Sequence, residues 1–270
     1  MAESRWDPPQ YARYADERGR PFHDLMGRVV STEPRVVVDL GCGPGSLTLT
    51  LAERWPDAHV VGVDHSPQML TTARAQDPHE RVEWVEGDLR TWDPATLDAP
   101  ADIVVTNAAL QWVPGHVALI ERWVAALRPG GWFAMQVPDS DDAPSHALMR
   151  EVAVGHPRAA DLAPAVRRLQ VEPPEVYLHR LAGLGCDVDV WSTTYLHVLD
   201  PEGRVEDPVL EWVRGTALRP VLDVLSDEGE REAFLAAYRM RLREAYPRTS
   251  AGVVLPFRRT FAVARRRHER

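Results

Sequence analysis

A glycine-rich turn constrains the fold of this chain more than any other feature of its sequence. The turn contains Gly41, Gly43 and Gly45; three valines at residues 36–38 precede it, and residues 46–55 have the composition of a helix. Glycine tolerates positive φ angles and lets a ligand approach the main chain. A helix that follows such a turn presents unpaired N–H groups at its start. The sequence therefore predicts a strand, a ligand-binding turn and a helix in this order.

The spacing of the glycines and an acid before them indicate which ligand the turn binds. A dinucleotide-binding turn reads G-x-G-x-x-G and seats a pyrophosphate, but here Ser46 occupies the position of the third glycine. Asp39 stands just before the turn, where a carboxylate repels a pyrophosphate and attracts an ammonium group. S-adenosylmethionine carries an α-amino group and a sulfonium but no phosphate, so the turn favours this cofactor. An NAD-dependent oxidoreductase is the remote alternative.

Acids also follow the next two apolar runs. Residues 60–64 end in Asp64, about twenty residues after the turn, where a carboxylate can accept hydrogen bonds from ribose hydroxyls. Residues 82–89 form a third run that contains Asp88, in a position suited to accept from the adenine amino group. Each acid alone also fits a solvated residue at the end of a strand. The ordered set together with the turn favours a cofactor site.

Apolar runs alternate with helical segments through the first half of the chain. Further strands are predicted at residues 102–107 and 132–138, and helices at residues 67–75 and 116–127. This alternation predicts a parallel sheet with helices on both faces. Ligands of such sheets bind at the carboxyl ends of the strands, where the three acids and Asn107 are expected.

The second half of the chain has a different pattern. Strands are predicted at residues 187–198 and 257–264, as antiparallel neighbours at one edge of the sheet. The other segments are predicted to form a loop at residues 156–164 and helices at residues 145–154, 174–184, 208–214 and 226–246. We expect the helices between these late strands to build a lid over the strand ends.

Composition excludes several classes of function. The formal net charge of −9 argues against nucleic acid as a partner, because phosphate binding needs a basic surface. No apolar stretch approaches the ~20 residues of a membrane span, and no signal-peptide core is expected at the start. Cys42 and Cys186 give no disulfide framework, which favours a reducing cytoplasm. The histidines show no paired metal-ligand spacing, so no metal site is predicted.

The order of predicted elements resembles class I S-adenosylmethionine-dependent methyltransferases over residues 35–138. Within this class the chain resembles the trans-aconitate methyltransferase family in residues 6–11, 17–21, 107–112, 146–151, 193–197 and 212–220. The resemblance implies an α/β protein with a Rossmann-like, seven-stranded, mostly parallel sheet, an antiparallel last strand, helices on both faces and helical lid insertions. It also implies a cytoplasmic enzyme that esterifies one carboxylate of a small tricarboxylic acid. A methyltransferase for another small acceptor and a non-catalytic cofactor-binding protein are the alternatives.

The expected organisation is a single elaborated domain in three parts. Residues 1–34 form an N-terminal helical lid segment, residues 35–138 the S-adenosylmethionine-binding core, and residues 139–270 a C-terminal part with the substrate lid and the last two strands. For the cofactor, aromatic faces favour a sulfonium, and amides and carboxylates suit its polar groups. The predicted cofactor-binding residues are Tyr11, Asp39, Gly41, Gly43, Gly45, Asp64, Ser66, Met69, Asp88, Leu89, Asn107, Gln111 and Trp112.

A carboxylate acceptor makes a general base unnecessary, because a carboxyl group titrates near pKa ~4 and is ionised at neutral pH. No catalytic residue is therefore predicted, and rate enhancement is expected from positioning and from removal of water. A substrate with up to three negative charges needs cations if it is buried. The predicted substrate-binding residues are Tyr14, Arg18, Arg150, Tyr195, His197 and Arg219. Arg258 and Arg259 are expected to face solvent.

Overall fold

The computed structural model describes residues 15–268 of the chain, with side chains from residue 19 onward. The described residues divide into two compact units. The first, here called the sheet unit, contains residues 16–138, 170–193 and 259–268. The second, here called the helical unit, contains residues 139–169 and 194–258. Residues 139–270, predicted as one C-terminal part, thus contribute to both units.

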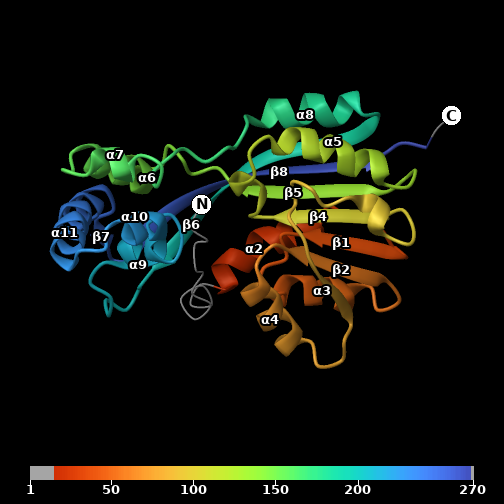
Figure 1. Ribbon diagram of the computed structural model, residues 1–270, viewed down its shortest axis with the longest axis horizontal. Coiled ribbons are helices and arrows are strands. Elements are labelled where there is room, and N and C mark those ends of the chain that lie inside the picture. The colour runs from red at the N-terminus through yellow and green to blue at the C-terminus, as the bar shows by residue number, and fades with distance from the viewer. Residues whose placement is uncertain (1–14, 269–270) are drawn as a thin grey trace. The chain divides into compact units, whose positions relative to one another are not determined.

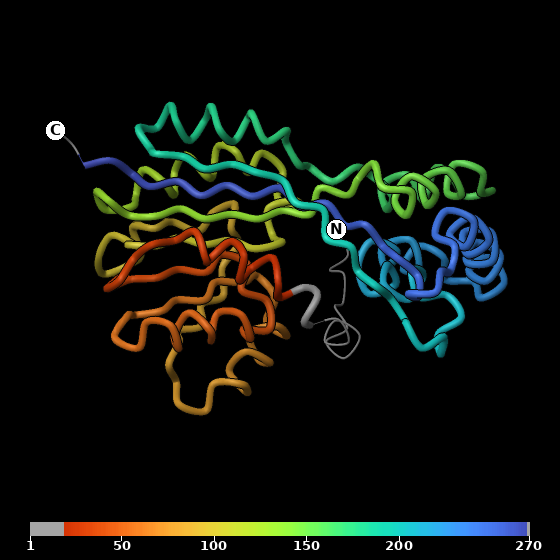
Figure 2. The backbone as a smooth tube through the Cα atoms, turned by 180° about the vertical axis from the view of Figure 1, so that it is seen from behind, coloured from red at the N-terminus to blue at the C-terminus, as the bar shows by residue number. Residues whose placement is uncertain are grey.

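The sheet has the strand order β3-β2-β1-β4-β5-β8-β6, and the short β7 pairs with β8 (Figure 1). The strands are β1 (Val36–Leu40), β2 (His59–Asp64), β3 (Val82–Glu86), β4 (Ile103–Asn107), β5 (Trp132–Pro138), β6 (Cys186–Leu199), β7 (Arg248–Thr249) and β8 (Gly252–Arg266). Strands β1 to β5 pair in parallel, whereas β8 is antiparallel to β5. Both views show β8 between β5 and β6 (Figures 1 and 2). The predicted Rossmann-like sheet with late antiparallel strands is therefore confirmed.

Helices cover both faces of the sheet unit. They are α2 (Ala15–Met26), α3 (Ser46–Arg54), α4 (Pro67–Gln76), α5 (His116–Ala126) and α8 (Pro174–Gly183), with short 3-10 turns at Pro94–Thr96 and Leu110–Trp112. Helices α3 and α4 pack beside β2 and β3, and α5 packs against β5 and α8. Because both faces are covered, the inner strands β1 and β4 contain continuous apolar runs, and every residue of β1 is buried.

The helical unit has a hydrophobic core of its own. Its helices are α6 (Pro144–Val154), α7 (Ala159–Leu162), α9 (Pro208–Arg214), α10 (Arg219–Val224) and α11 (Glu228–Ala245). Trp212, Phe234 and Tyr238 are among the buried residues of this core. Tyr238 Oη donates to the carbonyl oxygen of Ser145 at 2.6 Å, and the Ser145 amide donates to Tyr246 Oη at 3.0 Å. These two bonds hold the start of α6 against α11.

The structure differs from the sequence-based predictions at several element boundaries. Strand β3 ends at Glu86, so Asp88 lies in the turn beyond the strand. The predicted loop at residues 156–164 contains the short helix α7, and α10 was not predicted. Proline in the first turn of a helix is favourable, and Pro220 takes this position in α10. The boundaries of the long central elements agree closely with the prediction.

The N-terminal helix α2 packs within the sheet unit. Phe22 and Leu25 are fully buried. Arg54 of α3 donates to the carbonyl oxygens of Met26 and Val29 at 2.7 and 2.8 Å. These bonds fix the end of α2 and the chain that follows it onto α3. Within residues 15–268, no helix has the length and apolar character that crossing a bilayer requires.

Candidate functional site

The glycine turn between β1 and α3 has the backbone conformation that its sequence predicts. Gly41, Gly43 and Gly45 have φ angles of 80°, 56° and 85°, in the region that favours glycine. A Cβ at Gly41 would lie 2.4 Å from the Cβ of Ala109, and one at Gly45 would lie 2.6 Å from the Trp84 ring. A Cβ at Gly43 would meet nothing within 4 Å. Gly41 and Gly45 therefore permit close packing, and Gly43 faces open space where a ligand can approach the backbone.

Asp64, at the carboxyl end of β2, holds the glycine turn. Its Oδ2 accepts a hydrogen bond from the Gly43 amide at 2.9 Å, and its Oδ1 accepts from the Ser66 amide at 2.9 Å. Ser66 in turn caps α4 by accepting from the Met69 amide at 3.4 Å. A carboxylate can accept about four hydrogen bonds, so Asp64 retains capacity for the hydroxyl groups of a ligand.

Asp39 is a buried carboxylate inside β1. Its Oδ2 accepts from Thr48 Oγ1 of α3 at 2.7 Å. Burial raises the pKa of Asp39 to about 7; the Thr48 hydrogen bond opposes the shift and the negative charge of Asp64 adds to it. A nearby cation favours the ionised form of such a group. The Asp39 site therefore suits the ammonium group of a ligand better than a phosphate.

Asp88 lies beyond the end of β3 and is paired with Arg90. The Arg90 Nε lies 2.9 Å from each carboxylate oxygen of Asp88. This pairing lowers the pKa of Asp88. Its side chain is 36% exposed, so the carboxylate stays ionised and open to a further donor. Its assignment to the adenine amino group remains a prediction.

Buried polar atoms without hydrogen-bond partners lie at the end of β4 and in the turn that follows it. Among the described residues, Asn107 Oδ1 and Gln111 Oε1 are buried without a hydrogen-bond partner. The Gln111 Nε2 donates to the carbonyl oxygen of Ala108 at 2.7 Å, and Ala108 has a φ of 54°, which is strained for a residue with a Cβ. A buried acceptor without a donor is costly. An ammonium group offers three donors, so these atoms fit the amino acid part of S-adenosylmethionine.

Of the remaining predicted cofactor residues, the structure describes Met69, Leu89 and Trp112 but not Tyr11. Met69 and Leu89 are buried, and Trp112 is 40% exposed. A Leu89 methyl group would lie 3.8 Å from a Cβ at Gly41, which places Leu89 against the turn. Tyr11 lies outside the described residues.

The predicted substrate residues whose side chains the structure describes belong to the helical unit. Arg150 Nη1 lies 3.1 Å from Asp141 Oδ1, so part of its charge is already neutralised. Arg219 begins α10, and its Nε is buried without a hydrogen-bond partner among the described residues. Tyr195 and His197 are buried, with ring centroids 6.1 Å apart, and His197 also stacks on Trp212 at 4.9 Å. Tyr14 and the side chain of Arg18 lie outside the described residues.

One prediction from the sequence is wrong. Arg259, expected to face solvent, is 4% exposed, and its Nη1 donates to Gln136 Oε1 at 2.9 Å. The reason is that β8 lies inside the sheet between β5 and β6, and its residues from Arg259 to Ala264 are all buried. Arg258, its neighbour, is exposed and lies 3.2 Å from Asp139.

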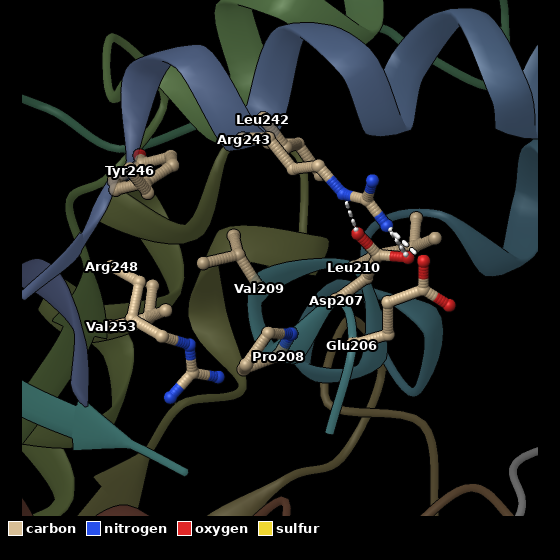
Figure 3. A pocket seen from close by; sticks show the side chains of 10 residues that line it. All are labelled: Glu206, Asp207, Pro208, Val209, Leu210, Leu242, Arg243, Tyr246, Arg248 and Val253. Carbon is tan, nitrogen blue, oxygen red and sulfur yellow. Dashed lines mark hydrogen bonds and ion pairs between the residues drawn. The ribbon is translucent and has the colours of Figure 1, made fainter. Parts of the chain in front are cut away.

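The helical unit contains a cavity of about 250 Å³, drawn in Figure 3. Its lining residues are Glu206, Asp207, Pro208, Val209, Leu210, Leu242, Arg243, Tyr246, Arg248 and Val253. Arg243 Nε donates to Asp207 Oδ1 at 2.6 Å, and Arg248 Nη2 donates to Asp200 Oδ2 at 2.6 Å. Because both arginines are engaged by carboxylates, this cavity is a poor site for an anionic substrate.

Sequence comparison identifies similar proteins along almost the whole chain. Residues 37–131 match the family described as methyltransferase domain. The chain is 50% identical over 266 residues to trans-aconitate 2-methyltransferase of Streptomyces avermitilis, with 96% of each chain covered. It is 48% identical over 269 residues to the protein of that name from Streptomyces coelicolor, covering 97% of this chain and 86% of the relative. The corresponding protein of Mycobacterium sp. strain KMS is 47% identical over 263 residues, with coverage of 96% and 99%.

Solved structures share the fold. A methyltransferase-like protein from Bacillus halodurans superposes with a TM-score of 0.55 at 16% identity, covering 93% of this chain and 100% of that chain. Phosphoethanolamine N-methyltransferase 2 of Haemonchus contortus, solved with S-adenosyl-L-methionine, gives a TM-score of 0.55 at 15% identity, with coverage of 94% and 53%. At these identities the similarity supports the fold alone.

Proposed function

Because this chain belongs to the trans-aconitate 2-methyltransferase family, we propose that it transfers a methyl group from S-adenosyl-L-methionine to a carboxylate of trans-aconitate or of a closely related small tricarboxylic acid. The products are the monomethyl ester and S-adenosylhomocysteine. The observation that carries this proposal is the identity of 50% that extends over 96% of the chain. This similarity includes the helical unit, whose residues lie outside the general methyltransferase match.

The cofactor supplies an electrophilic methyl group on its sulfonium. In this proposal, residues of the sheet unit bind the cofactor. We assign the ribose hydroxyls to Asp64, which already organises the glycine turn through the Gly43 amide. We assign the ammonium group to Asp39, Asn107 and Gln111, whose buried oxygens need a positive or donating partner. Each of these groups binds or orients the cofactor, and none needs to exchange a proton during methyl transfer.

The acceptor oxygen needs no activation by a base. A carboxylate is ionised at neutral pH, and its lone pair displaces the sulfur leaving group in line with the methyl carbon. Orientation of two reactants can supply roughly 7–11 kcal/mol of rate enhancement. Exclusion of water from the carboxylate adds to this. We therefore propose that residues of this chain position and desolvate the reactants and that no residue acts as general acid or base.

We propose Arg219 as the acceptor-binding arginine of the helical unit, because its Nε is buried without a partner among the described residues. Arg150 contributes less in this proposal, since Asp141 already pairs with it. Tyr195 and His197 offer buried polar atoms on β6. We also propose Tyr14 and Arg18 as acceptor-binding residues, on the sequence pattern alone.

We propose that the enzyme acts in the cytoplasm on a small anionic acid, without nucleic acid or membrane partners. Cys42 and Cys186 are both free and buried, and free thiols suit a reducing compartment. The net charge of −9 opposes binding to nucleic acid.

A methyl-transfer assay tests the proposal. Purified enzyme and cofactor with a labelled methyl group are incubated with trans-aconitate, cis-aconitate, citrate and a dicarboxylate such as fumarate. We expect label in a base-labile ester and the highest kcat/KM with trans-aconitate. Preferential methylation of a different acceptor would support the alternative of another small-molecule methyltransferase. Tight binding of S-adenosylhomocysteine without methylation of any acid would contradict the proposed activity.

A further inference from the structure

The helical unit contains a buried histidine next to one of the arginines proposed for acceptor binding. His146 lies in the first turn of α6 and is 8% exposed, and Arg150 lies four residues further along the same helix. Residues four apart are neighbours on a helix surface. Arg150 Nη1 lies 3.1 Å from Asp141 Oδ1, and the charges of Asp141 and Arg150 both act on the His146 ring. The three side chains therefore form one polar cluster within the helical unit.

The His146 ring is neutral at neutral pH. Burial lowers the pKa of His146 to about 4; the negative charge of Asp141 opposes this shift, and the positive charge of Arg150 adds to it. A neutral imidazole has one nitrogen that donates a hydrogen bond and one that accepts. The histidine therefore offers a single directed N–H group rather than a positive charge.

Ser145 determines which ring nitrogen carries the proton. Its Oγ lies 3.3 Å from His146 Nδ1, and this hydroxyl has no other partner among the described residues. Ser145 is buried, and a buried hydroxyl that donates to nothing is costly. The hydroxyl therefore donates to Nδ1, which leaves the ring proton on Nε2. Tyr238 and Tyr246 hold the Ser145 backbone, so the imidazole is fixed before a ligand binds.

Two buried donors in this segment lack acceptors. The Nε2–H of His146 has none within the part of the chain that the structure describes. Ser140 is 3% exposed, and its Oγ likewise has no hydrogen-bond partner there. Two successive turns connect these residues: the Ala143 amide donates to the Ser140 carbonyl oxygen, and the His146 amide donates to that of Ala143, each at 2.9 Å. A ligand with acceptor oxygens would remove the cost of burying such donors.

Arg150 retains donors for the same ligand. Its Nη1 and Nη2 donate to Asp141 Oδ1 and to the Asp141 carbonyl oxygen at 3.1 and 2.6 Å. A guanidinium has five N–H groups, and these bonds use two of them. The Arg150 side chain is 21% exposed, so a ligand can reach the others. A carboxylate has two oxygens and accepts from two donors at once.

We infer that His146 is an acceptor-binding residue whose Nε2–H donates to a carboxylate that Arg150 also contacts. The inference rests on the proposed function and adds to it a neutral donor in the helical unit. Asp141 already offsets part of the Arg150 charge, and the histidine strengthens the hold on an anion without burying a second cation. Ser145 is a positioning residue, because it acts through the imidazole.

Substitutions at His146 test the inference through the KM for trans-aconitate. His146→Phe keeps a ring and removes both nitrogens, so this KM should rise about tenfold or more. The affinity for S-adenosylhomocysteine, measured by calorimetry, should change by less than about threefold. His146→Gln retains an N–H donor near the position of Nε2 and should keep KM within about threefold of wild type. His156→Phe, at the other histidine of residues 139–169, is the matched control and should leave KM unchanged.

NMR of the histidine rings provides a measurement that does not depend on catalysis. In protein labelled with nitrogen-15, the His146 signals are assigned by their absence from His146→Gln. They should show the Nε2–H form between pH 6 and pH 8, and Ser145→Ala should give a mixture of the two neutral forms. With S-adenosylhomocysteine present, trans-aconitate should shift the Nε2 signal, whereas its uncharged trimethyl ester should shift it much less. If His146→Phe does not fold, this titration decides the outcome.

The results distinguish this inference from the proposed function. Wild-type enzyme that methylates trans-aconitate, together with an unchanged KM in His146→Phe or an unshifted Nε2 signal, would overturn the inference alone. An equal rise of KM in His156→Phe would indicate a general effect of packing and would also overturn it. Wild-type protein that binds S-adenosylhomocysteine but methylates no acid would overturn the proposed function and this inference with it.

Discussion

The buried carboxylate of Asp39 predicts that cofactor binding depends on pH near neutrality. Burial raises the pKa of this group to about 7 in the protein without ligand, so about half of the molecules carry a protonated Asp39 at pH 7. The ammonium group of a bound cofactor favours the ionised carboxylate. Binding below pH 7 must therefore release a proton from Asp39.

The size of this effect follows from the pKa. The ionised fraction falls tenfold for each pH unit below the pKa, so affinity at pH 6 should be about tenfold weaker than at pH 8. S-adenosylhomocysteine is a suitable probe because it retains the α-amino group and is not consumed. Calorimetry at pH 6 and pH 8 measures the affinities, and buffers of different ionisation enthalpy report the released proton.

Asp39→Asn is the matched variant, because it keeps an acceptor for Thr48 and removes the charge. It should bind S-adenosylhomocysteine more weakly at pH 8, and its affinity should show little pH dependence.

The folding stability of the variant should rise, whereas its affinity for the ligand falls. The pKa of Asp39 is raised in the folded state above its ordinary 3.8, so its contribution to stability is fully present below pH 3.8 and is lost as the pH rises through about 7. That loss reaches up to about 4 kcal/mol.

The variant avoids this loss, so it should melt at a higher temperature than wild type at pH 8. Equal affinities of the wild type at pH 6 and pH 8, or the same pH dependence in Asp39→Asn, would refute the placement of the cofactor ammonium beside Asp39.

Three further substitutions test other parts of the site. Asp64→Ala removes the acceptor of both the Gly43 and the Ser66 amides. A hydrogen bond to a charged group contributes about 1.5–3 kcal/mol, so the variant should have a lower melting temperature and bind S-adenosylhomocysteine at least tenfold more weakly. An unchanged affinity in calorimetry would contradict the assignment of Asp64. Gly43→Ala should lower the free energy of unfolding only by the about 1–2 kcal/mol of a left-handed residue, because its Cβ meets open space. Gly45→Ala should lower it more, because its Cβ would meet the Trp84 ring. Equal losses in thermal unfolding would argue against this packing. Arg219→Ala should raise KM for trans-aconitate about tenfold or more with little change for the cofactor, and unaltered kinetics would remove Arg219 from the acceptor site.

Sequence periodicity predicted the alternating elements well because each depends on local pattern. Strand β5 and helix α9 begin and end at the predicted residues. Glycine and proline interrupt regular structure, so an apolar run next to them has well-defined ends. The short helix α10 was missed because its six residues, fewer than two helical turns, carry too weak a periodic signal. Asp88 was expected at a strand end but lies in the turn after β3, where its pairing with Arg90 shapes the chain.

The order of glycines and acids along the chain was sufficient to predict the turn and a cofactor without phosphate, because these depend on residues adjacent to strand ends. Sequence alone could not show that Asp64 uses its carboxylate to hold the turn, or that Thr48 donates to Asp39, because both contacts join separate elements. The burial of Arg259 was decided by the position of β8 between β5 and β6. Two adjacent arginines have the same local chemistry, and only the tertiary packing of the sheet determines which one is enclosed and which one faces water.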